Sequence, residues 1–275
     1  MDDDDVRADA VRSFSRPRYF YGQLLDVRHF ESEQAYFKRK QWMLNRLISG
    51  FGVVCGLDVQ VGDDDHSVVV LPGVALDRLG REIVVPSRSK KIPIEVKPAP
   101  EPGGGNGNSG NPAVGARGNV KRHDDGSCDD DWVHLVICYD ECKTDPEPVL
   151  SGGCEGPERC APGAIREGYA LRLEPGRAPD ISVDSSIPNL IKGNNVDYRA
   201  LVRWVSEPCG GGGRGGACIT LANIRLPSGE GSSEGTVELS HIDISVRPIV
   251  YSLDLLWELM LSLSHETQNR HSGKH

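Results

Sequence analysis

Several short motifs that mark catalytic and nucleotide-binding sites are missing from the sequence. No His-Glu-x-x-His zinc motif and no Walker loop occurs in the 275 residues, and no dinucleotide-binding fingerprint follows an expected strand. The stretches GGGNGNSG and GGGGRGG are rich in glycine, but no helix is expected to begin after them, so they do not predict a phosphate site. We therefore predict that the protein is not an enzyme.

The chain also lacks a long apolar run. Its N-terminal sequence, MDDDDVRADAVRSF, has neither the positive charge nor the apolar stretch of a signal peptide. Hydrophobic residues make up 38% of the chain, which is enough for a core without a membrane span. We expect synthesis and residence in the cytoplasm, with export only inside a larger particle or on cell lysis.

Positive charge is scarce. The net charge is −9 at pH 7, whereas binding to a nucleic-acid backbone needs clustered Lys and Arg to replace the counterions of the phosphates. The one basic run, Lys38 to Lys40, is short and is typical of a solvated helix face. We expect no nucleic-acid partner.

A long amphipathic helix is expected from Asp26 to Ser49, with Asp26 as its cap and Gly50 at its end. Its apolar positions recur at helical spacing and are Phe30, Phe37, Met43, Leu44, Leu47 and Ile48. We expect this face to be buried against apolar surface, and Phe37→Ala to cost about 3–5 kcal/mol if that side chain is fully buried. The pattern does not say whether the helix packs only on its own domain or also on a neighbouring subunit.

After Gly52 the apolar period changes from helical to alternating, which predicts strands. Residues 57–61 and 67–71 are expected to pair as a hairpin across an acidic turn, and residues 74–76 and 82–85 as a second hairpin. Residues 92–96 are expected to form an edge strand, because Pro93 cannot donate a hydrogen bond to a sheet. Residues 1–97 would then form an N-terminal module of a helix plus β-hairpins, used for docking.

Residues 98–130 contain little apolar material and much Gly, Asn and Pro, so we expect a flexible insertion. A second β-rich unit with a Cys-rich loop and a C-terminal helix is expected over 131–266, followed by a disordered tail over 267–275. Its expected elements are strands at 132–139 and 167–173 that pair across the cysteine-bearing loop, a helix at 197–205, strands at 219–226 and 236–246, and a helix at 252–265. The predicted fold class is α+β, mostly antiparallel, with a long helix near each end.

The order of several short motifs resembles a known family. An aromatic-Gly-Gln-Leu opening leads into NRLISGFGVVCGL and then PGVALDRLGREIV, and later come CKTDPEP, IREGYAL, LANI and RPIVYS. This order resembles phage-tail-like structural proteins of contractile injection system clusters, which are baseplate or fibre components. The resemblance implies a structural assembly protein at the baseplate, the spike periphery or the fibre attachment, whose partners are other tail proteins. A sixfold tail favours a homo-oligomer, trimer or hexamer.

Eight cysteines in a chain without a secretion signal suggest thiols or metal ligands rather than a disulfide framework. Cys138, Cys142, Cys154 and Cys160 lie close together in sequence, and four thiolates can hold a structural zinc ion. Cys138 also fits a buried strand position, and either cysteine near the second glycine-rich loop, Cys209 or Cys218, could replace it. Disulfides formed after release and unligated thiols are the alternatives.

The aromatic segment before the long helix is a candidate docking patch, because rigid aromatic side chains offer a large contact area. Its residues are Arg18, Tyr19, Phe20, Tyr21 and Leu24. The alternative is that these side chains cover the protein's own core. For the whole chain, the alternative to an assembly protein is a carbohydrate- or surface-binding β-module or a zinc-dependent hydrolase that uses the loops around Cys142 and Cys160.

Overall fold

The structure is a computed structural model that describes residues 13–94, 131–149, 160–179, 191–192, 195–206, 216–226 and 237–272. The helical elements are α1 (Val27–Leu44), the π-helical turn η2 (Asn45–Ser49), α2 (Tyr198–Val205), the 3₁₀ turn η4 (Leu239–His241) and α3 (Leu253–Ser272). The strands of the first half are β1 (Gly52–Gly56), β2 (Val59–Val61), β3 (Ser67–Val70), β4 (Gly73–Leu76), β5 (Glu82–Val85) and β6 (Ile92–Pro93). Those of the second half are β7 (Trp132–Pro148), β8 (Cys160–Pro175), β9 (Ile191–Lys192), β10 (Asn195–Val196), β11 (Ile219–Arg225) and β12 (Ile242–Asp243). The predicted insertion at 98–130 lies outside the described residues.

The helical segment made of α1 and η2 begins and ends at the residues that the sequence predicts. The Asp26 side chain accepts a hydrogen bond from the Val27 backbone N–H, and the His29 ring accepts one from the Asp26 backbone N–H, as in a capping box. The helix continues through the π-helical turn η2 and stops at Gly50, whose φ of 77° few other residues adopt easily. The predicted helix over 26–49 is confirmed.

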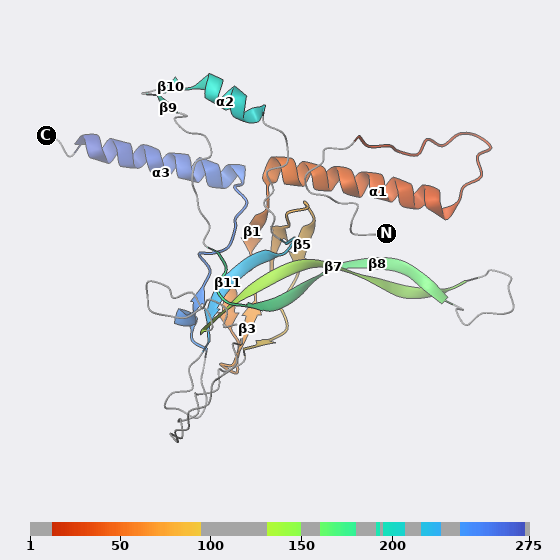
Figure 1. Cartoon of the computed structure of the whole chain (residues 1–275), viewed down its shortest axis with the longest axis horizontal. Coiled ribbons are helices and arrows are strands. Elements are labelled where there is room, and N and C mark those ends of the chain that lie inside the picture. Colours follow the sequence, from red (N-terminus) through yellow and green to blue (C-terminus); the bar gives the residue numbers. More distant parts are fainter. Residues whose placement is uncertain are drawn as a thin grey trace, which may run out of the picture.

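Three antiparallel sheets make up the body of the molecule, in the orders β1-β4-β5, β2-β3-β6 and β12-β11-β7-β8 (Figure 1). The strands β2 and β3 pair as the first predicted hairpin, and β4 and β5 pair as the second. Strand β6, which contains Pro93, lies at the edge of its sheet as expected. Together with a helix near each end of the chain, these sheets confirm the predicted α+β fold.

One hydrophobic core joins both halves of the chain. Its fully buried side chains include Leu57, Val68 and Ile83 from the first half and Ile137 and Leu221 from the second. The strands that carry Ile137 and Leu221, β7 and β11, are hydrogen-bonded neighbours inside the four-stranded sheet. The regions predicted as two units, 1–97 and 131–266, are therefore packed on each other through apolar side chains.

Strands β7 and β8 form a long ribbon, and only its base belongs to the core. They pair from Val133 with Pro175 at the base to Pro148 with Cys160 at the tip. Side chains of β7 are mostly buried as far as Cys138 and mostly exposed after Tyr139. Much of the segment expected to be a cysteine-bearing loop is thus strand, because the residues of β7 from Val133 to Pro148, except Asp145, pair with residues of β8.

Two expectations for the second half are wrong. Residues 236–246 do not form one strand: a 3₁₀ turn precedes the two-residue β12, and local hydrogen bonds to the His241 ring and the Asp243 carboxylate compete with sheet pairing there. Residues 267–272, predicted as part of a disordered tail, continue helix α3. No glycine or proline interrupts the sequence from Leu253 until Gly273, so nothing ends the helix earlier.

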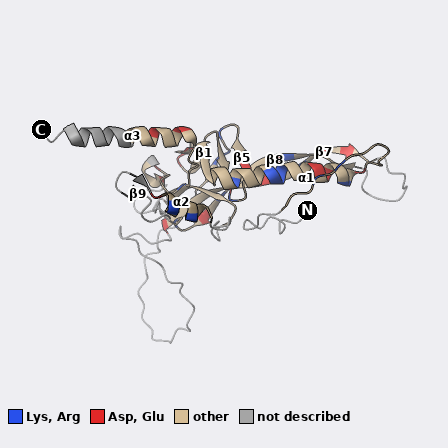
Figure 2. Cartoon of the chain, turned by 90° about the horizontal axis from the view of Figure 1, so that it is seen from above, with Lys and Arg blue, Asp and Glu red and all other residues tan. Residues whose placement is uncertain are grey.

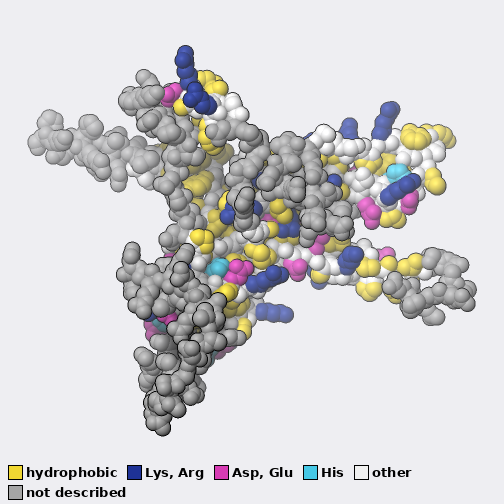
Figure 3. Space-filling view, viewed as in Figure 1, with side chains coloured by type: hydrophobic (Ala, Val, Ile, Leu, Met, Phe, Trp, Pro, Cys, Tyr) yellow, Lys and Arg dark blue, Asp and Glu magenta, His cyan; other side chains and the backbone are white. Residues whose placement is uncertain are grey.

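Several elements project from the body. Helix α1 and the β7–β8 ribbon extend to one side, and α3 extends to the opposite side, in two perpendicular views (Figures 1 and 2). Figure 3 shows hydrophobic side chains in yellow on the outer parts of the projections that carry α1 and the ribbon. The molecule therefore consists of a packed body and protruding arms.

Candidate functional site: an exposed docking surface

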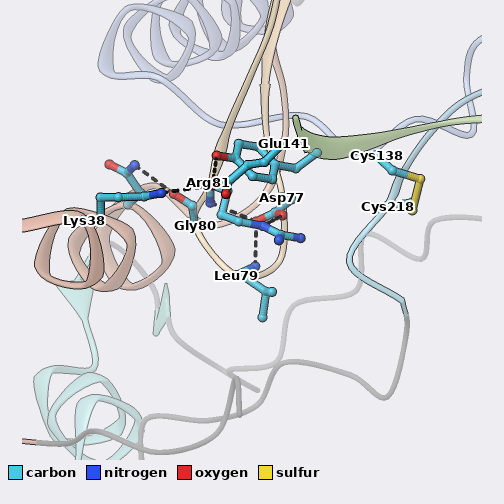
Figure 4. A network of polar contacts seen from close by, with 10 residues as sticks. Lys38, Asp77, Leu79, Gly80, Arg81, Cys138, Glu141 and Cys218 are labelled. Atoms are coloured by element: carbon cyan, nitrogen blue, oxygen red, sulfur yellow. Dashed lines mark hydrogen bonds and ion pairs between the residues drawn. A yellow bond between two sulfur atoms is a disulfide. The ribbon is translucent and has the colours of Figure 1, made fainter. Parts of the chain in front are cut away.

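The turn between β4 and β5 is built to receive helix α1. Asp77, whose side chain is fully buried, accepts hydrogen bonds from the backbone N–H groups of Leu79 and Arg81, each 2.8 Å long. The Arg81 side chain closes the turn with an ion pair of 2.6 Å from its Nε to Asp77 Oδ2 (Figure 4). The Asp77 carboxylate thereby satisfies backbone donors that the tight turn leaves without sheet partners.

Gly80, at the tip of this turn, touches the helix backbone. Its φ is 88°, and a Cβ added there would overlap the Trp42 carbonyl oxygen. The Gly80 carbonyl accepts a hydrogen bond of 2.9 Å from the Asn45 side chain at the end of α1. Only glycine meets both requirements, a left-handed backbone and a direct helix contact.

Polar side chains on one face of α1 complete the attachment. Lys38, Gln41 and Asn45 follow the spacing i, i+3, i+7, which places them on the same face. Gln41 and Asn45 both donate to the carboxylate of Glu82 on β5. Lys38 forms an ion pair with Glu141 on β7, with 2.9 Å between Nζ and Oε1. The helix is thus held by hydrogen bonds and an ion pair to two different sheets.

The Lys38 contact belongs to a larger polar cluster at the root of the ribbon. The Tyr139 hydroxyl donates to Glu141 Oε1 at 2.6 Å, and the Arg81 guanidinium lies over the Tyr139 ring with 4.7 Å to its centroid. The hydrogen bond from Tyr139 and then the ion pair with Lys38 hold the pKa of Glu141 below its ordinary value. Burial, followed by the hydrogen bond to Glu141, raises the pKa of Tyr139. The cluster ties α1, the β4–β5 turn and the ribbon together.

The apolar face of α1 is exposed. No residue of α1 or η2 is buried, and Phe37 of α1 and Ile48 of η2 keep 62% and 78% of their surfaces accessible to solvent. The prediction that Phe30, Phe37, Leu44 and Ile48 pack against apolar surface is therefore wrong for the isolated chain. The reason is that the face with Lys38, Gln41 and Asn45 contacts the body, so the apolar face remains in solvent.

The aromatic segment before α1 folds back along the helix. Phe14 packs edge-to-face on Tyr36 with 6.3 Å between ring centroids, and the Tyr19 hydroxyl donates to Glu33 at 3.0 Å. The other residues of the candidate patch, Arg18, Phe20, Tyr21 and Leu24, are exposed, with Tyr21 fully so. These aromatic side chains do not cover the core of the chain. They add exposed apolar surface immediately before α1 in the chain.

Helix α3 exposes a second apolar surface. Leu253, Leu256, Trp257 and Met260 are all exposed, and none of the described strands covers them. A cavity of about 620 Å³ lies where the end of η2 meets the segment that leads into α3. It is lined mainly by Gly50, Phe51, Ile244, Pro248, Ile249 and Tyr251. Exposed apolar groups thus surround the root of both helices.

The structure does not bring the four predicted zinc ligands together. Cys138 forms a disulfide with Cys218, which corrects its assignment as a ligand. Cys142 and Cys160 are exposed on the ribbon, where Cys142 pairs with Arg166 and Cys160 pairs with Pro148. The two pairs are six positions apart along each strand, so the two cysteines are roughly 20 Å apart along the ribbon.

Two thiolates that share one zinc ion must each lie about 2.3 Å from it, so Cys142 and Cys160 cannot be ligands of the same ion in this arrangement. Cys154 lies outside the described residues. Within the described part of the chain, no three His, Cys, Asp or Glu side chains converge as a metal-binding group. The interpretation as a loop-ordering zinc site assumed a loop where the structure has a paired ribbon.

Sequence reasoning missed the residues that position the arm. The motif DRLGRE contains Asp77, Gly80, Arg81 and Glu82, and the motif NRLISG contains Asn45. From the sequence alone, both motifs indicate only turns and packing contacts. An Asp side chain that accepts hydrogen bonds from backbone N–H groups a few residues further along the chain is typical of a tight turn. The contact of that turn with a helix some 35 residues away could not be read from local pattern.

A scan against protein-family models finds no match, and a search of curated proteins finds none. In the described residues, no helix is both long enough and apolar enough to cross a membrane.

Proposed function

We propose that this chain is a structural, non-enzymatic assembly component of a contractile phage-tail-like particle, at the baseplate, the spike periphery or the fibre attachment. It acts by protein–protein docking through α1 and the aromatic segment that precedes it. The observation that carries this proposal is the exposed apolar face of α1 on a chain whose core is already complete.

Exposure alone is common on protein surfaces, and single apolar residues need no explanation. Here the exposed residues are large and numerous: Phe20, Tyr21 and Leu24 are followed in sequence by Phe30, Phe37 and Leu44 of α1 and Ile48 of η2. An exposed apolar surface of this kind marks a site of interaction. Aromatic residues are enriched at the energetic centres of such interfaces.

Helix α1 is also fixed on the body before any partner binds. The Asp77 turn, the Glu82 hydrogen bonds and the Lys38–Glu141 ion pair hold the helix at several points from Lys38 to Asn45. A preorganised surface loses less conformational freedom on binding than a flexible one, which favours affinity. Rigid attachment of an otherwise uncovered helix supports docking better than it supports catalysis.

The class of particle is supported by the order of motifs in the sequence. The motifs NRLISG and DRLGRE, on which the resemblance rests, contain the residues that attach α1 to the β4–β5 turn. A shared pattern at these positions would preserve the geometry of the arm.

Sedimentation of the particle from the native host tests the proposal. The tagged chain should sediment with sheath, tube and baseplate proteins. Phe37→Gln should reduce this recovery at least about tenfold, because it removes an exposed apolar group while glutamine keeps a good helix propensity. Ser32→Gln is the matched control, since this exposed residue lies five positions away on a different face of α1. A chain found only in the supernatant, or equal recovery of both variants with the wild type, contradicts the proposal.

A further inference from the structure

Helices α1 and α3 carry apolar stripes with the same period. On α1, Phe30, Phe37 and Leu44 are spaced by seven residues, and on α3 Leu253 and Met260 are spaced by seven. Leu256 and Trp257 lie between the latter two at i+3 and i+4, on the same face. A seven-residue apolar repeat is the pattern of helices that pack side by side at a small crossing angle.

The two helices are also matched in length and opposite in charge. At 18 and 20 residues they are roughly 27 and 30 Å long. Helix α1 has four basic residues against two acidic ones if His29 is neutral; Lys38, next to Phe37, is paired with Glu141 of the body, and Arg39 and Lys40 follow it. Helix α3 has three acidic residues and one basic one, and two of the acidic residues, Asp254 and Glu258, lie three residues before and one residue after Trp257. Opposite charges beside matched stripes favour α1 and α3 as partners over two copies of either helix.

In one chain the two faces do not meet. Helix α3 leaves the body away from α1 (Figure 1). Its root is held by hydrogen bonds from Val53 N to Pro248 O, 2.8 Å, and from Val250 N to Val53 O, 2.9 Å. Trp257 is 58% exposed and Leu253 is 85% exposed in this position. An isolated helix of this length is marginally stable in water and gains most of its stability from packing.

We propose that α3 of one copy packs along the apolar stripe of α1 of a second copy, with Trp257 and Met260 against Phe37 and Leu44. This inference rests on the proposed docking function and names its first partner, a second copy of this chain. Because the two contacting helices differ, the contact can form twice in a two-fold pair or repeat around a closed ring.

A photo-crosslink tests which helices meet and whether they belong to different copies. The full chain carries p-benzoylphenylalanine in place of Trp257, and ¹⁴N- and ¹⁵N-labelled preparations are mixed as dilute monomers before concentration. Irradiation should join residue 257 to peptides from 27–48, with about half of these products containing one light and one heavy peptide. The same probe at Ser262, which is exposed on another face of α3, should give at least fivefold fewer α1 products.

Products that carry only one label would show that α3 folds back on its own α1 and would overturn the inference. Products that lack α1 peptides would overturn it as well. Either result can occur while the chain still sediments with the particle, so the failure of this inference is distinguishable from that of the docking function.

A double-mutant cycle provides a second measurement. Phe37→Gln and Trp257→Gln should each weaken self-association at least tenfold in sedimentation equilibrium, and the double variant should be little weaker than either single one, because both remove the same contact. Independent, multiplicative effects would contradict direct contact between these residues. Circular dichroism of each variant checks that the fold is retained.

Discussion

The body and the arms of this protein use apolar residues in opposite ways. In the body, side chains such as Ile137 and Leu221 are completely buried in one cluster. On the arms, Phe37 and Trp257 keep more than half of their surfaces in contact with solvent, and α1 is attached by hydrogen bonds and ion pairs. The difference teaches that an amphipathic pattern predicts that the apolar face of a helix will be covered. The pattern does not show whether the same chain or another molecule covers it.

The largest expected loss of stability comes from the body. Leu221→Ala on the central strand β11 should lower the free energy of unfolding by about 3–5 kcal/mol, because it removes a fully buried side chain and leaves a cavity. Urea denaturation of the chain at low concentration measures the effect. A loss below about 1 kcal/mol would contradict the assignment of β11 to the core.

Removal of the disulfide in the body should cause the next-largest loss of stability. Cys138 and Cys218 are 80 residues apart in sequence, and closing a loop of that length restricts the unfolded chain. Cys218→Ser should lower the free energy of unfolding by about 2–4 kcal/mol. Cys55→Ser, at an exposed free thiol, is the control and should change it by less than about 0.5 kcal/mol. Equal effects would mean that the disulfide does not stabilise the body.

A change at the junction between the body and α1 should cause an intermediate loss of stability. Gly80→Ala introduces left-handed strain and a Cβ that collides with the Trp42 carbonyl, so it should cost about 2–3 kcal/mol in unfolding free energy. Gly176 has nearly the same φ, 81°, with no atom near the added Cβ. Gly176→Ala should therefore cost only the strain, about 1 kcal/mol. Identical values for the two variants would mean that α1 does not rest on the β4–β5 turn.

On the arm, the same kind of truncation should have little effect on stability. Phe37→Ala should change the free energy of unfolding of the monomer by less than about 1 kcal/mol, since the side chain is mostly in solvent already. A value of about 3–5 kcal/mol, as expected of a buried phenylalanine, would restore the interpretation of α1 as part of the core. The measurement is made at concentrations where the chain is monomeric.

The smallest effect concerns the ion pair of Lys38 with Glu141. The pKa of Glu141 is lowered in the folded chain, so its contribution is present above its ordinary pKa and is lost as the pH falls through the folded-state value. Because the pair is partly exposed, Glu141→Gln should cost no more than about 0.5 kcal/mol at pH 7. Denaturation at pH 7 and pH 3 should show this difference shrinking in acid. A difference that grows in acid would have the wrong sign.

Much of the fold could be predicted from local pattern. The cap at Asp26, the stop at Gly50, both hairpins and the edge strand with Pro93 depend on neighbouring residues, and the structure confirms them. The length of the β7–β8 ribbon was underestimated because its outer half has no buried face to produce alternation. The Cys138–Cys218 disulfide joins strands brought together only by the sheet, so sequence spacing grouped Cys138 with the wrong cysteines.

The candidate site was predictable in part. The aromatic segment with Tyr19, Phe20 and Tyr21 could be identified from its composition, and its exposure is what a docking patch requires. The orientation of α1 could not, because it depends on hydrogen bonds between Asn45 and a turn far along the chain. A helix with polar residues at 38, 41 and 45 offers two faces that can be attached, and the sequence does not rank them.

Hydrogen–deuterium exchange of the free and the assembled chain tests the central claim most directly, because it shows which amides become protected when the chain assembles. In the free monomer, amides of α1 should exchange much faster than those of β11, because an arm held by polar contacts opens locally while the core does not. On assembly, exchange over 27–48 should slow at least about tenfold and exchange in β11 should stay unchanged. If α1 in the free monomer is protected as strongly as β11, and assembly does not change it, the apolar face of α1 is not a docking surface.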